Sequence, residues 1–423
     1  MNIVMMTNTY KPIVGGLEKS VETFAEEFRK RGHRVLIVAP EFKGFPCCRE
    51  KDVFRVPAIQ NFEGTGFSVE LPVPTKLSWI LKRFKPDIIH SQHPFLIGDT
   101  ALRVSAKFNK PVIFTYHTLY ERNANYFFGG SKIFTSFVIK LSIGYANLCD
   151  RIVAPSQSIA VLLRRQGVKK QIDVIPTGIH KEDFKGGDGL AFRKFFGIPR
   201  EAFVVGTVSR IVSEKNIVFL ARAVAEFLKL NKQAYFVIVG EGDLLEQIQI
   251  LLQKAKVMDR VVLTGVLTGK KLIHAYAAMD VFAFASHSET QGIILAEAMA
   301  AGKPVVAVNA SAIREVVKNK QNGRIIGRDT ISGFVDALSW VARQDPQERF
   351  ALSRCARKTA ENFSVSQSVK KMLKVYQEAC KNKRVSYDLE NSAWAKTIRQ
   401  LKAQASLLLN TAKSTVSAIT DRR

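Results

Sequence analysis

The chain has 423 residues, of which 47% are hydrophobic and 24% are charged. This composition excludes a disordered or collagen-like chain, and the length is sufficient for two domains that each bury a core. The formal net charge of +26 favours an acidic partner, which leaves nucleic acid, an anionic lipid surface and phosphorylated substrates as candidate classes.

The cysteines and the N-terminal segment indicate a reduced, cytosolic setting. The five cysteines are odd in number and show neither a zinc spacing nor a Cys-x-x-Cys pair. Residues 1–7 carry no basic region and lead into a polar loop, so they predict a strand rather than a signal peptide. Lys140 interrupts the longest apolar run, and no uncharged run reaches the roughly 18 residues that cross a bilayer. Any membrane contact is therefore expected to be peripheral.

Short apolar runs typical of buried strands alternate with helical stretches such as residues 17–30. In the first half the predicted strands are residues 3–6, 35–39, 88–91, 112–116, 151–154 and 173–175. The second half repeats the scheme, with predicted strands at 204–208, 235–239, 261–264, 281–284, 305–308 and 323–326. This alternation predicts an α/β fold with parallel sheets, in which ligands bind at the carboxyl ends of the strands.

The chain is expected to divide at residues 181–189, which are polar, contain glycine and lack periodicity. We predict one Rossmann-like domain over 1–180, a second over 190–383, and a basic amphipathic helical tail over 384–423. In the tail, apolar residues recur at alternating steps of four and three, at Trp394, Ile398, Leu401, Ala405, Leu408, Ala412, Val416 and Ile419. Such a helix could dock on the body, pair with another chain or lie on a membrane, and we rank docking first.

Three segments of the first half carry candidate site residues. Gly15 and Gly16 precede the first predicted helix and allow close approach of the backbone to an anion, although a plain turn explains them equally well. His90 and Tyr116 lie in the last residues of two predicted strands, and His93 and His117 follow these strands. A side chain just past such a strand can point into a ligand cleft, but a lone histidine there is more often structural.

In the second half, Arg210 and Lys215 lie in a polar loop after a predicted strand, where they could neutralise a phosphate or simply be solvated. The fragment around Gly240 and Gly242 is a weak glycine signal, because a full dinucleotide fingerprint is lacking. A tight turn between a strand and a helix accounts for it at least as well as binding of a nucleotide base.

The segment 286–306 is the most informative, because it sets Glu289 in a loop and Glu297 in the helix that follows, with Thr290, Gln291, Gly292 and Ile293 between them. The amides at the helix start attract an anion. A diphosphate could lie there while Glu289 accepts hydrogen bonds from sugar hydroxyls and Glu297 from ribose hydroxyls. For a bare pair of glutamates, an N-terminal-turn acid and a helix-surface acid would be the simpler interpretation.

The flanking residues favour the first interpretation, because the whole segment resembles the glutamate-x7-glutamate signature of family 4 glycosyltransferases. The Glu289-Thr290-Gln291-Gly292 form is most similar to that of bacterial diacylglycerol glucosyltransferases. Other segments resemble the family in the same order along the chain, namely residues 11–18, 87–93, 114–121, 154–156, 174–179 and 206–216. Ser209 stands where the family usually has glycine. The likeness covers residues 1 to about 382.

The resemblance implies a GT-B fold with two Rossmann-like domains facing across a cleft, the first binding the acceptor and the second the nucleotide sugar. It implies that His117 donates a hydrogen bond, and in protonated form a positive charge, beside the transferred sugar, while His90, His93 and Tyr116 lie on the acceptor side. Arg210 and Lys215 would neutralise the leaving diphosphate. The chain contains no Asp-x-Asp, so no metal is expected. Donor binding is expected from Gly15, Gly16, Arg210, Lys215, Gly240, Gly242, Glu289, Thr290, Gln291, Gly292, Ile293 and Glu297.

Two further segments bear on membrane contact. Residues 76–85 place Leu77, Ile80, Leu81 and Phe84 on one helical stripe with basic residues nearby, so this helix could lie on an anionic bilayer or pack on the sheet. The apolar stretch 127–148 could be an acceptor-side surface or plain core.

We therefore predict a cytoplasmic, retaining hexosyltransferase, peripheral on the inner face of the cell membrane, that uses UDP- or GDP-hexose and no cofactor. The expected acceptor is a membrane lipid such as diacylglycerol, with phosphatidylinositol or a cell-surface polysaccharide as alternatives. A basic nucleic-acid-binding protein and a sugar-nucleotide epimerase are alternatives from other classes. No nucleic-acid partner is expected, because no binding motif appears and aromatic residues are not interleaved with basic ones.

Overall fold

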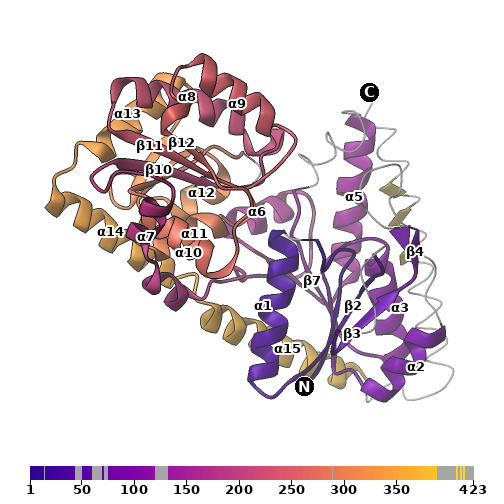
Figure 1. The fold of residues 1–423 in the computed structure, drawn as a ribbon. Coiled ribbons are helices and arrows are strands. Elements are labelled where there is room, and N and C mark those ends of the chain that lie inside the picture. Colours follow the sequence, from indigo (N-terminus) through magenta and orange to yellow (C-terminus); the bar gives the residue numbers. More distant parts are fainter. Residues whose placement is uncertain are drawn as a thin grey trace. The chain divides into compact units, whose positions relative to one another are not determined.

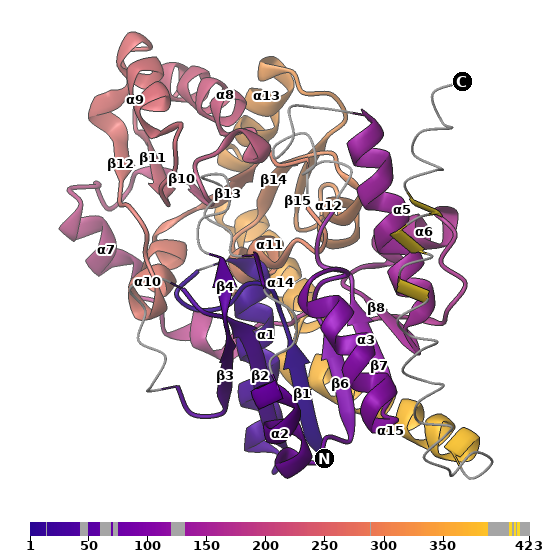
Figure 2. The same cartoon turned by 90° about the vertical axis from the view of Figure 1, so that its right-hand side faces the viewer.

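The computed structural model describes residues 1–13, 15–42, 50–59, 69–70, 75–119, 132–287, 289–387 and six positions of the tail, namely 406, 407, 410, 411, 413 and 414. These residues form two compact units. The first contains Met1–Thr177 and the chain from Val365 onward, and the second is Gly178–Ser364. Both appear in Figure 1 and, turned by 90°, in Figure 2.

The unit boundaries differ from the predicted domain boundaries in two places. Residues 181–189, predicted as a linker, form the 3-10 helix η3 (Lys181–Gly186) and the start of α7 (Gly189–Phe195), both within the second unit. The long helix α15 (Val365–Tyr387), most of which was assigned to the second domain, belongs to the first unit. Periodicity predicts such a helix, but not the sheet on which it packs.

The first unit is built on a seven-stranded sheet in the order β3-β2-β1-β6-β7-β8-β9, in which every pair is parallel. Its strands are buried apolar runs, as expected for a parallel sheet covered on both faces. They are β1 (Asn2–Met6), β2 (Arg34–Pro40), β3 (Val53–Val56), β6 (Ile88–Ser91), β7 (Val112–Thr115), β8 (Arg151–Ala154) and β9 (Ile172–Val174). The short strands β4 (Ala58–Ile59) and β5 (Val69–Glu70) pair separately and antiparallel.

Helices cover both faces of this first sheet. On one face, α1 (Gly16–Lys30) packs beside α15, whose buried residues Val365, Val369, Met372, Tyr376 and Ala379 recur at helical spacing (Figure 1). The other face is covered by α2 (Thr75–Phe84), α3 (Ile97–Phe108), α5 (Lys132–Leu148) and α6 (Gln157–Arg165).

The second unit repeats the design with a six-stranded parallel sheet in the order β12-β11-β10-β13-β14-β15. Its strands are β10 (Phe203–Val208), β11 (Ala234–Val239), β12 (Val261–Leu263), β13 (Val281–Phe284), β14 (Val305–Val308) and β15 (Gly323–Ile326). One face packs on α8 (Ile217–Leu230), α9 (Leu245–Lys254) and α13 (Ile331–Ala342). The other packs on α7, α10 (Gly269–Ala278), α11 (Ile293–Ala300), α12 (Ser311–Val316) and α14 (Pro346–Glu361).

The strand order places a switch point in each sheet. Successive crossovers leave β1 between β2 and β6, and leave β10 between β11 and β13. Chains that leave adjacent strands in opposite directions open a crevice at the carboxyl ends, where α/β proteins bind ligands. The loops after β10 and β13 meet at the carboxyl edge of the second sheet, and those after β1 and β6 meet at that of the first.

The structure also resolves the alternatives for α2 and part of the tail. Leu77, Leu81 and Phe84 are buried in the core, so the apolar stripe of α2 packs on the body, while Trp79 remains 58% exposed. In the tail, the buried side chain of Leu407 joins the core of the first unit, and the Asn410 side-chain amide donates to the Leu141 carbonyl of α5 over 3.0 Å. The described part of the tail therefore docks on the body.

The predicted apolar stripe of the tail lies outside the described residues, as do residues 127–131 of the apolar stretch. None of the described helices combines the length and the apolar character that a membrane crossing requires.

Candidate functional site

The phosphate-loop candidates lie directly after β10 of the second unit. The chain forms the 3-10 helix η4 (Ser213–Lys215) and enters α8 through Asn216, which adopts a left-handed conformation with φ of 53°. The ammonium of Lys215 lies 3.6 Å from Oε2 of Glu289, and their side chains are only 20% and 14% exposed. The structure thus brings together two residues that are 74 positions apart in the sequence and that were both predicted to serve the donor.

Arg210 belongs to the same loop but has a different environment. Its side chain is 63% exposed and forms an ion pair with Glu214. The Ser286 hydroxyl donates to the Glu214 carbonyl over 3.4 Å, so the loop after β13 is tied to the loop after β10. The guanidinium is therefore at the surface of the loop, whereas the Lys215 ammonium lies largely inside it.

The start of α11 has the backbone geometry that the sequence pattern requires. Gly292 has φ of 74°, a conformation that residues with a side chain rarely adopt, and it begins the helix directly after Glu289, Thr290 and Gln291. Thr290 and Ile293 are half-buried, and Gln291 is buried. The amides of the first turn of α11 thus lie in the same short segment as Glu289.

Glu297 lies inside α11, in the helix that follows the Glu289 loop, and is only 2% exposed. Its Oε2 accepts a hydrogen bond of 2.9 Å from the hydroxyl of Tyr276, a buried residue of α10. Burial, together with the negative charge of Glu297, raises the pKa of Tyr276 well above its ordinary value. Glu297 is therefore a buried, partnered carboxylate and not a helix-surface acid.

Packing explains Gly240 and Gly242. A Cβ on Gly240 would approach the Ser209 carbonyl, and one on Gly242 would approach the Ile211 carbonyl, in both cases far closer than van der Waals contact allows. The Ile211 amide donates to the Glu241 carbonyl over 2.7 Å. These glycines let the loop after β11 pack on the phosphate-loop candidate, and their predicted donor contacts stay predictions.

In the first unit, His117 follows β7 and its Nε2 lies 2.7 Å from the side-chain oxygen of Gln92. Burial lowers the pKa of His117 to about 4, so the imidazole is neutral near pH 7 and donates this hydrogen bond. His117 therefore carries no charge in this state of the protein, and its predicted role beside the transferred sugar stays a prediction.

The other predicted acceptor-side residues lie deeper. His90 is buried, and its two ring nitrogens lie 2.6 Å from the Thr115 and Tyr376 hydroxyls. Tyr116 is fully buried. His93 is half-buried and accepts a hydrogen bond from the Asn8 amide, and burial lowers the pKa of both His90 and His93 to about 3. The structure gives His90 and Tyr116 positions in the core, and acceptor contacts for all three stay predictions.

Gly15 and Gly16 lie at the start of α1. Gly15 is in extended backbone that any residue can adopt, and a Cβ on Gly16 would meet no atom within 4 Å. Neither backbone strain nor packing explains Gly16, which leaves room beside its backbone for the close approach that the sequence predicts.

Comparisons with known proteins decide the family. Residues 14–183 match the model described as Glycosyltransferase Family 4, and residues 190–359 match that of Glycosyl transferases group 1. The alpha-monoglucosyldiacylglycerol synthase of Streptococcus pneumoniae is 31% identical over 377 residues, which cover 86% of this chain and 83% of that protein. The chain belongs to family 4 of the glycosyltransferases.

Two further relatives are similar over most of the chain. The alpha-monoglucosyldiacylglycerol synthase of Acholeplasma laidlawii is 26% identical over 84% of this chain and 92% of that protein. A GDP-mannose-dependent alpha-mannosyltransferase of Corynebacterium glutamicum is 27% identical over 77% of this chain and 76% of that protein. These two relatives are named for different activities, synthesis of monoglucosyldiacylglycerol in one and mannosyl transfer from GDP-mannose in the other.

Solved structures confirm the GT-B fold of this family 4 member. Anabaena HepE in complex with UDP has a TM-score of 0.72 at 19% identity and covers 89% of this chain and all of that chain. A sucrose-phosphate synthase of Thermosynechococcus elongatus has a TM-score of 0.74 at 19% identity, over 89% of this chain and 98% of that chain. At this identity the likeness concerns the fold.

Sequence reasoning missed one cluster beside the family signature. His287 Nε2 lies 2.6 Å from Asp329 Oδ2, and the Asn216 side-chain amide lies 3.3 Å from the same ring nitrogen. The three residues follow β13, β15 and η4. Because all of these segments lie at the carboxyl edge of one parallel sheet, the strand order alone could have placed them together.

Proposed function

We propose that this family 4 glycosyltransferase moves a hexose from UDP- or GDP-hexose to a membrane lipid such as diacylglycerol, with retention of configuration and without a metal cofactor. The observation that carries the donor half is the Lys215–Glu289 pair beside the start of α11. The lipid half is supported by the similarity over 86% of the chain to an alpha-monoglucosyldiacylglycerol synthase.

The donor half follows from charge and hydrogen-bonding capacity. A diphosphate is attracted to the amides of the first turn of α11, and Glu289 can accept hydrogen bonds from the hexose hydroxyls. Glu297 serves the ribose hydroxyls, while Thr290, Gln291 and Ile293 lie between the two carboxylates. Lys215 is held at the carboxylate of Glu289, so an ammonium is available to the departing diphosphate.

The chemical step places few demands on a nucleophilic side chain. In the retaining mechanism that we propose, the leaving phosphate oxygen takes the proton of the acceptor hydroxyl on the same face of an oxocarbenium-like sugar. Arg210 and Lys215 then stabilise the charge that builds on the diphosphate. The neutral imidazole of His117 forms a hydrogen bond with the sugar. Glu289 positions the sugar without forming a covalent bond to it.

Membrane association fits the surface of α2. The apolar stripe of this helix is buried against the body, but Trp79 remains exposed. The Arg83 guanidinium lies 4.7 Å from the centre of the Trp79 ring. Lys76 and Lys82 are exposed on the same short helix. An exposed tryptophan among basic side chains suits the interface of an anionic bilayer. This supports peripheral membrane association, and we propose the cytoplasmic face of the cell membrane as its location.

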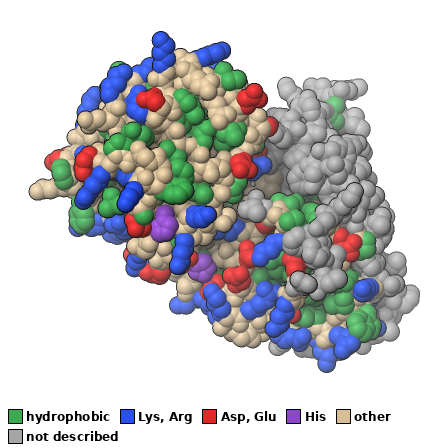
Figure 3. All heavy atoms as spheres, in the orientation of Figure 1, with side chains coloured by type: hydrophobic (Ala, Val, Ile, Leu, Met, Phe, Trp, Pro, Cys, Tyr) green, Lys and Arg blue, Asp and Glu red, His purple; other side chains and the backbone are tan. Residues whose placement is uncertain are grey.

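A polysaccharide or phosphatidylinositol acceptor is the second candidate, because the relatives of this chain are not all named as diacylglycerol enzymes. The distribution of charge on one face gives no support to a nucleic-acid partner. On the face seen in Figure 3, lysine and arginine side chains are dispersed and acidic side chains lie among them, whereas nucleic-acid binding favours a basic stripe.

The deciding experiment incubates the enzyme with labelled UDP-glucose, UDP-galactose or GDP-mannose and a total lipid extract. We expect one donor to label diacylglycerol, with a product whose anomeric configuration matches the donor and whose rate is unchanged by EDTA. Labelling of phosphatidylinositol alone, or of an added cell-surface polysaccharide alone, would replace diacylglycerol as the acceptor. Inversion of the anomeric configuration, or a loss of rate in EDTA, would contradict the proposed mechanism. Release of nucleoside diphosphate that does not depend on an acceptor would contradict transfer.

A further inference from the structure

Tyr276 lies in the last turn of α10 and is fully buried. Its ring packs against Phe184 and Phe282, with centroid separations of 5.7 Å and 5.9 Å. A phenylalanine would satisfy these apolar contacts. The hydroxyl is a buried polar group that needs a partner, and it has one in Glu297, at 2.9 Å.

The direction of this hydrogen bond is fixed. Because burial and the nearby carboxylate raise the pKa of Tyr276 well above its ordinary value, the phenol keeps its proton at physiological pH. The phenol therefore donates and the carboxylate accepts. A hydrogen bond to an ionised carboxylate is among the stronger contacts in a protein interior, and it favours one rotamer of the acid.

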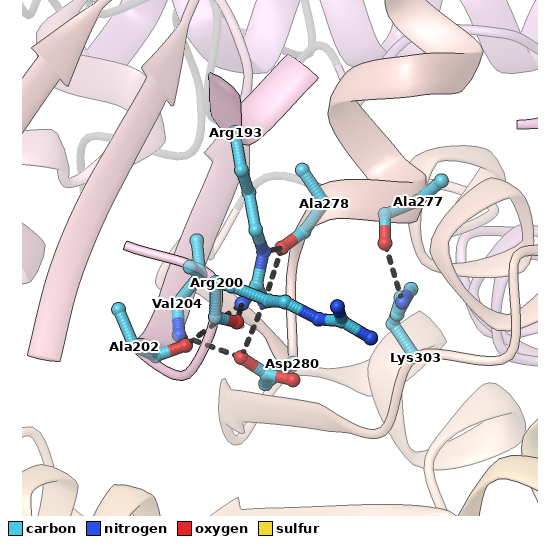
Figure 4. A network of polar contacts seen from close by, with 8 residues as sticks. All are labelled: Arg193, Arg200, Ala202, Val204, Ala277, Ala278, Asp280 and Lys303. Carbon is cyan, nitrogen blue, oxygen red and sulfur yellow. Dashed lines mark hydrogen bonds and ion pairs between the residues drawn. The ribbon is translucent and has the colours of Figure 1, made fainter. Parts of the chain in front are cut away.

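The two helices that carry this pair are also tied together at their ends, as Figure 4 shows. Lys303, which follows α11, donates to the carbonyl of Ala277 in α10 over 2.9 Å. Arg193 of α7 donates to the next carbonyl, that of Ala278, and forms an ion pair with Asp280 over 2.8 Å. Tyr276 directly precedes Ala277 in the chain. The hydrogen bond from Lys303 to Ala277 therefore restrains the distance between Tyr276 and α11.

We infer that Tyr276 is a positioning residue for the donor, and that its hydroxyl holds the Glu297 carboxylate in the orientation that accepts hydrogen bonds from the ribose hydroxyls of the nucleotide. This inference rests on the proposed function, in which Glu297 binds the ribose. It adds a residue from α10, outside the glutamate signature, and assigns it selectivity for a ribonucleotide over its deoxy form.

The test compares binding of UDP and GDP with binding of 2′-deoxy-UDP and 2′-deoxy-GDP, measured by isothermal titration calorimetry on the full chain. In Tyr276→Phe the aromatic packing is kept and the donor is lost. We expect the affinity for the ribonucleotide that binds wild type to fall by at least about tenfold and the affinity for its deoxy form, which keeps only the 3′-hydroxyl, to fall less, so that the ribo-to-deoxy ratio decreases.

Tyr235→Phe is the matched control, because Tyr235 is a partly buried tyrosine of β11 in the same unit. It should leave the ratio as in wild type. Thermal unfolding of both variants checks the fold. If Tyr276→Phe weakens both nucleotides equally, or neither, its hydroxyl has a purely structural role and the inference is overturned.

Glu297→Gln separates this inference from the proposed function. If Glu297→Gln removes the preference for the ribonucleotide over its deoxy form and Tyr276→Phe leaves this preference unchanged, the inference about Tyr276 alone fails. If Glu297→Gln leaves both the affinity and the ratio unchanged, the ribose role of Glu297 fails and the inference falls with it. In the double variant we expect no loss beyond that of Glu297→Gln, because both changes remove one interaction. If Tyr276→Phe does not fold, Tyr276→His takes its place. Losses of nucleotide affinity that add up in the double variant of Tyr276→His and Glu297→Gln would then overturn the inference.

Discussion

The carboxyl edges of the two sheets carry the candidate residues in opposite electrostatic states. In the second unit, Lys215 and Glu289 meet as an ion pair beside a helix start. In the first unit, burial lowers the pKa of His93 to about 3 and that of His117 to about 4, so neutral imidazoles line the edge. One architecture thus presents charge where a diphosphate is proposed to bind, and neutral hydrogen-bonding groups where hydroxyls are proposed to bind.

The largest effect should come from removing the cation of the charged edge. In Lys215→Ala we expect kcat to fall by about 10²–10³, since the ammonium would stabilise charge that develops only as the diphosphate leaves. The Michaelis constant for the donor should change little. Steady-state kinetics with the identified donor measure both constants.

Lys229→Ala provides the control for Lys215→Ala. Lys229 is a lysine of α8 whose ammonium lies 2.8 Å from Glu226 at the surface, so its loss removes the same charge far from the site. A Lys215 variant that raised only the Michaelis constant would assign this lysine to ground-state binding and weaken the contrast between the two edges.

Much of this contrast could be predicted from the sequence. The strands β6 and β13 were predicted with the bounds that the structure has, because buried apolar runs between polar loops leave few alternatives. The placement of Glu289 before a helix and Glu297 inside it also followed from the pattern. Contacts between distant segments did not, since neither the Tyr276–Glu297 hydrogen bond nor the His287–Asp329 pair has a local signal.

The first edge was harder to predict. A histidine near the end of a strand is consistent with a surface site or with the core, and the choice depends on which side chains pack on it. For His90 that is Tyr376 of α15, which lies 286 positions further along the chain. Nothing in the periodicity of α15 indicates that it returns to the first sheet.

The helix ties beneath the charged edge give a pH-dependent prediction. Burial lowers the pKa of Lys303 from 10.5 to about 8. Between these values the unfolded chain binds more protons than the folded one, so the contribution of Lys303 to the free energy of unfolding rises with pH. Between pH 7.5 and 10.5, the free energy of unfolding of wild type should therefore rise by up to about 3 kcal/mol relative to that of Lys303→Met.

Urea unfolding at several pH values measures the difference between wild type and Lys303→Met. Lys229→Met is the control, because it removes a lysine whose side chain lies at the surface of α8. A constant difference between wild type and Lys303→Met would mean that the ammonium of Lys303 stays protonated in the folded protein throughout this range.

A smaller effect is expected at the neutral edge. His117→Asn keeps a hydrogen-bond donor but changes its position, and we expect kcat/KM to fall by about tenfold. Because the folded pKa of His117 is about 4, lowering the pH from 8 to 5 should not protonate it. The pH profile of wild type should therefore show no histidine titration near 6.5 that His117→Asn removes. A step that disappears in the variant would mean that His117 carries charge during catalysis.

The smallest effect concerns the tail, where Asn410 donates to the Leu141 carbonyl and lies against Gly144 of α5. Asn410→Ala removes one part-buried hydrogen bond and should lower the free energy of unfolding by about 1 kcal/mol. Thr411→Ala is the control, because the Thr411 hydroxyl donates a hydrogen bond within the tail, to the Leu407 carbonyl.

Liposome pelleting of wild type and of a chain truncated at Val385 tests whether the docked tail also binds the membrane. Because docking occupies the Leu407 and Asn410 side of the tail, we expect binding to anionic vesicles to persist after truncation, through α2. Loss of binding would transfer the membrane contact from the first unit to the tail.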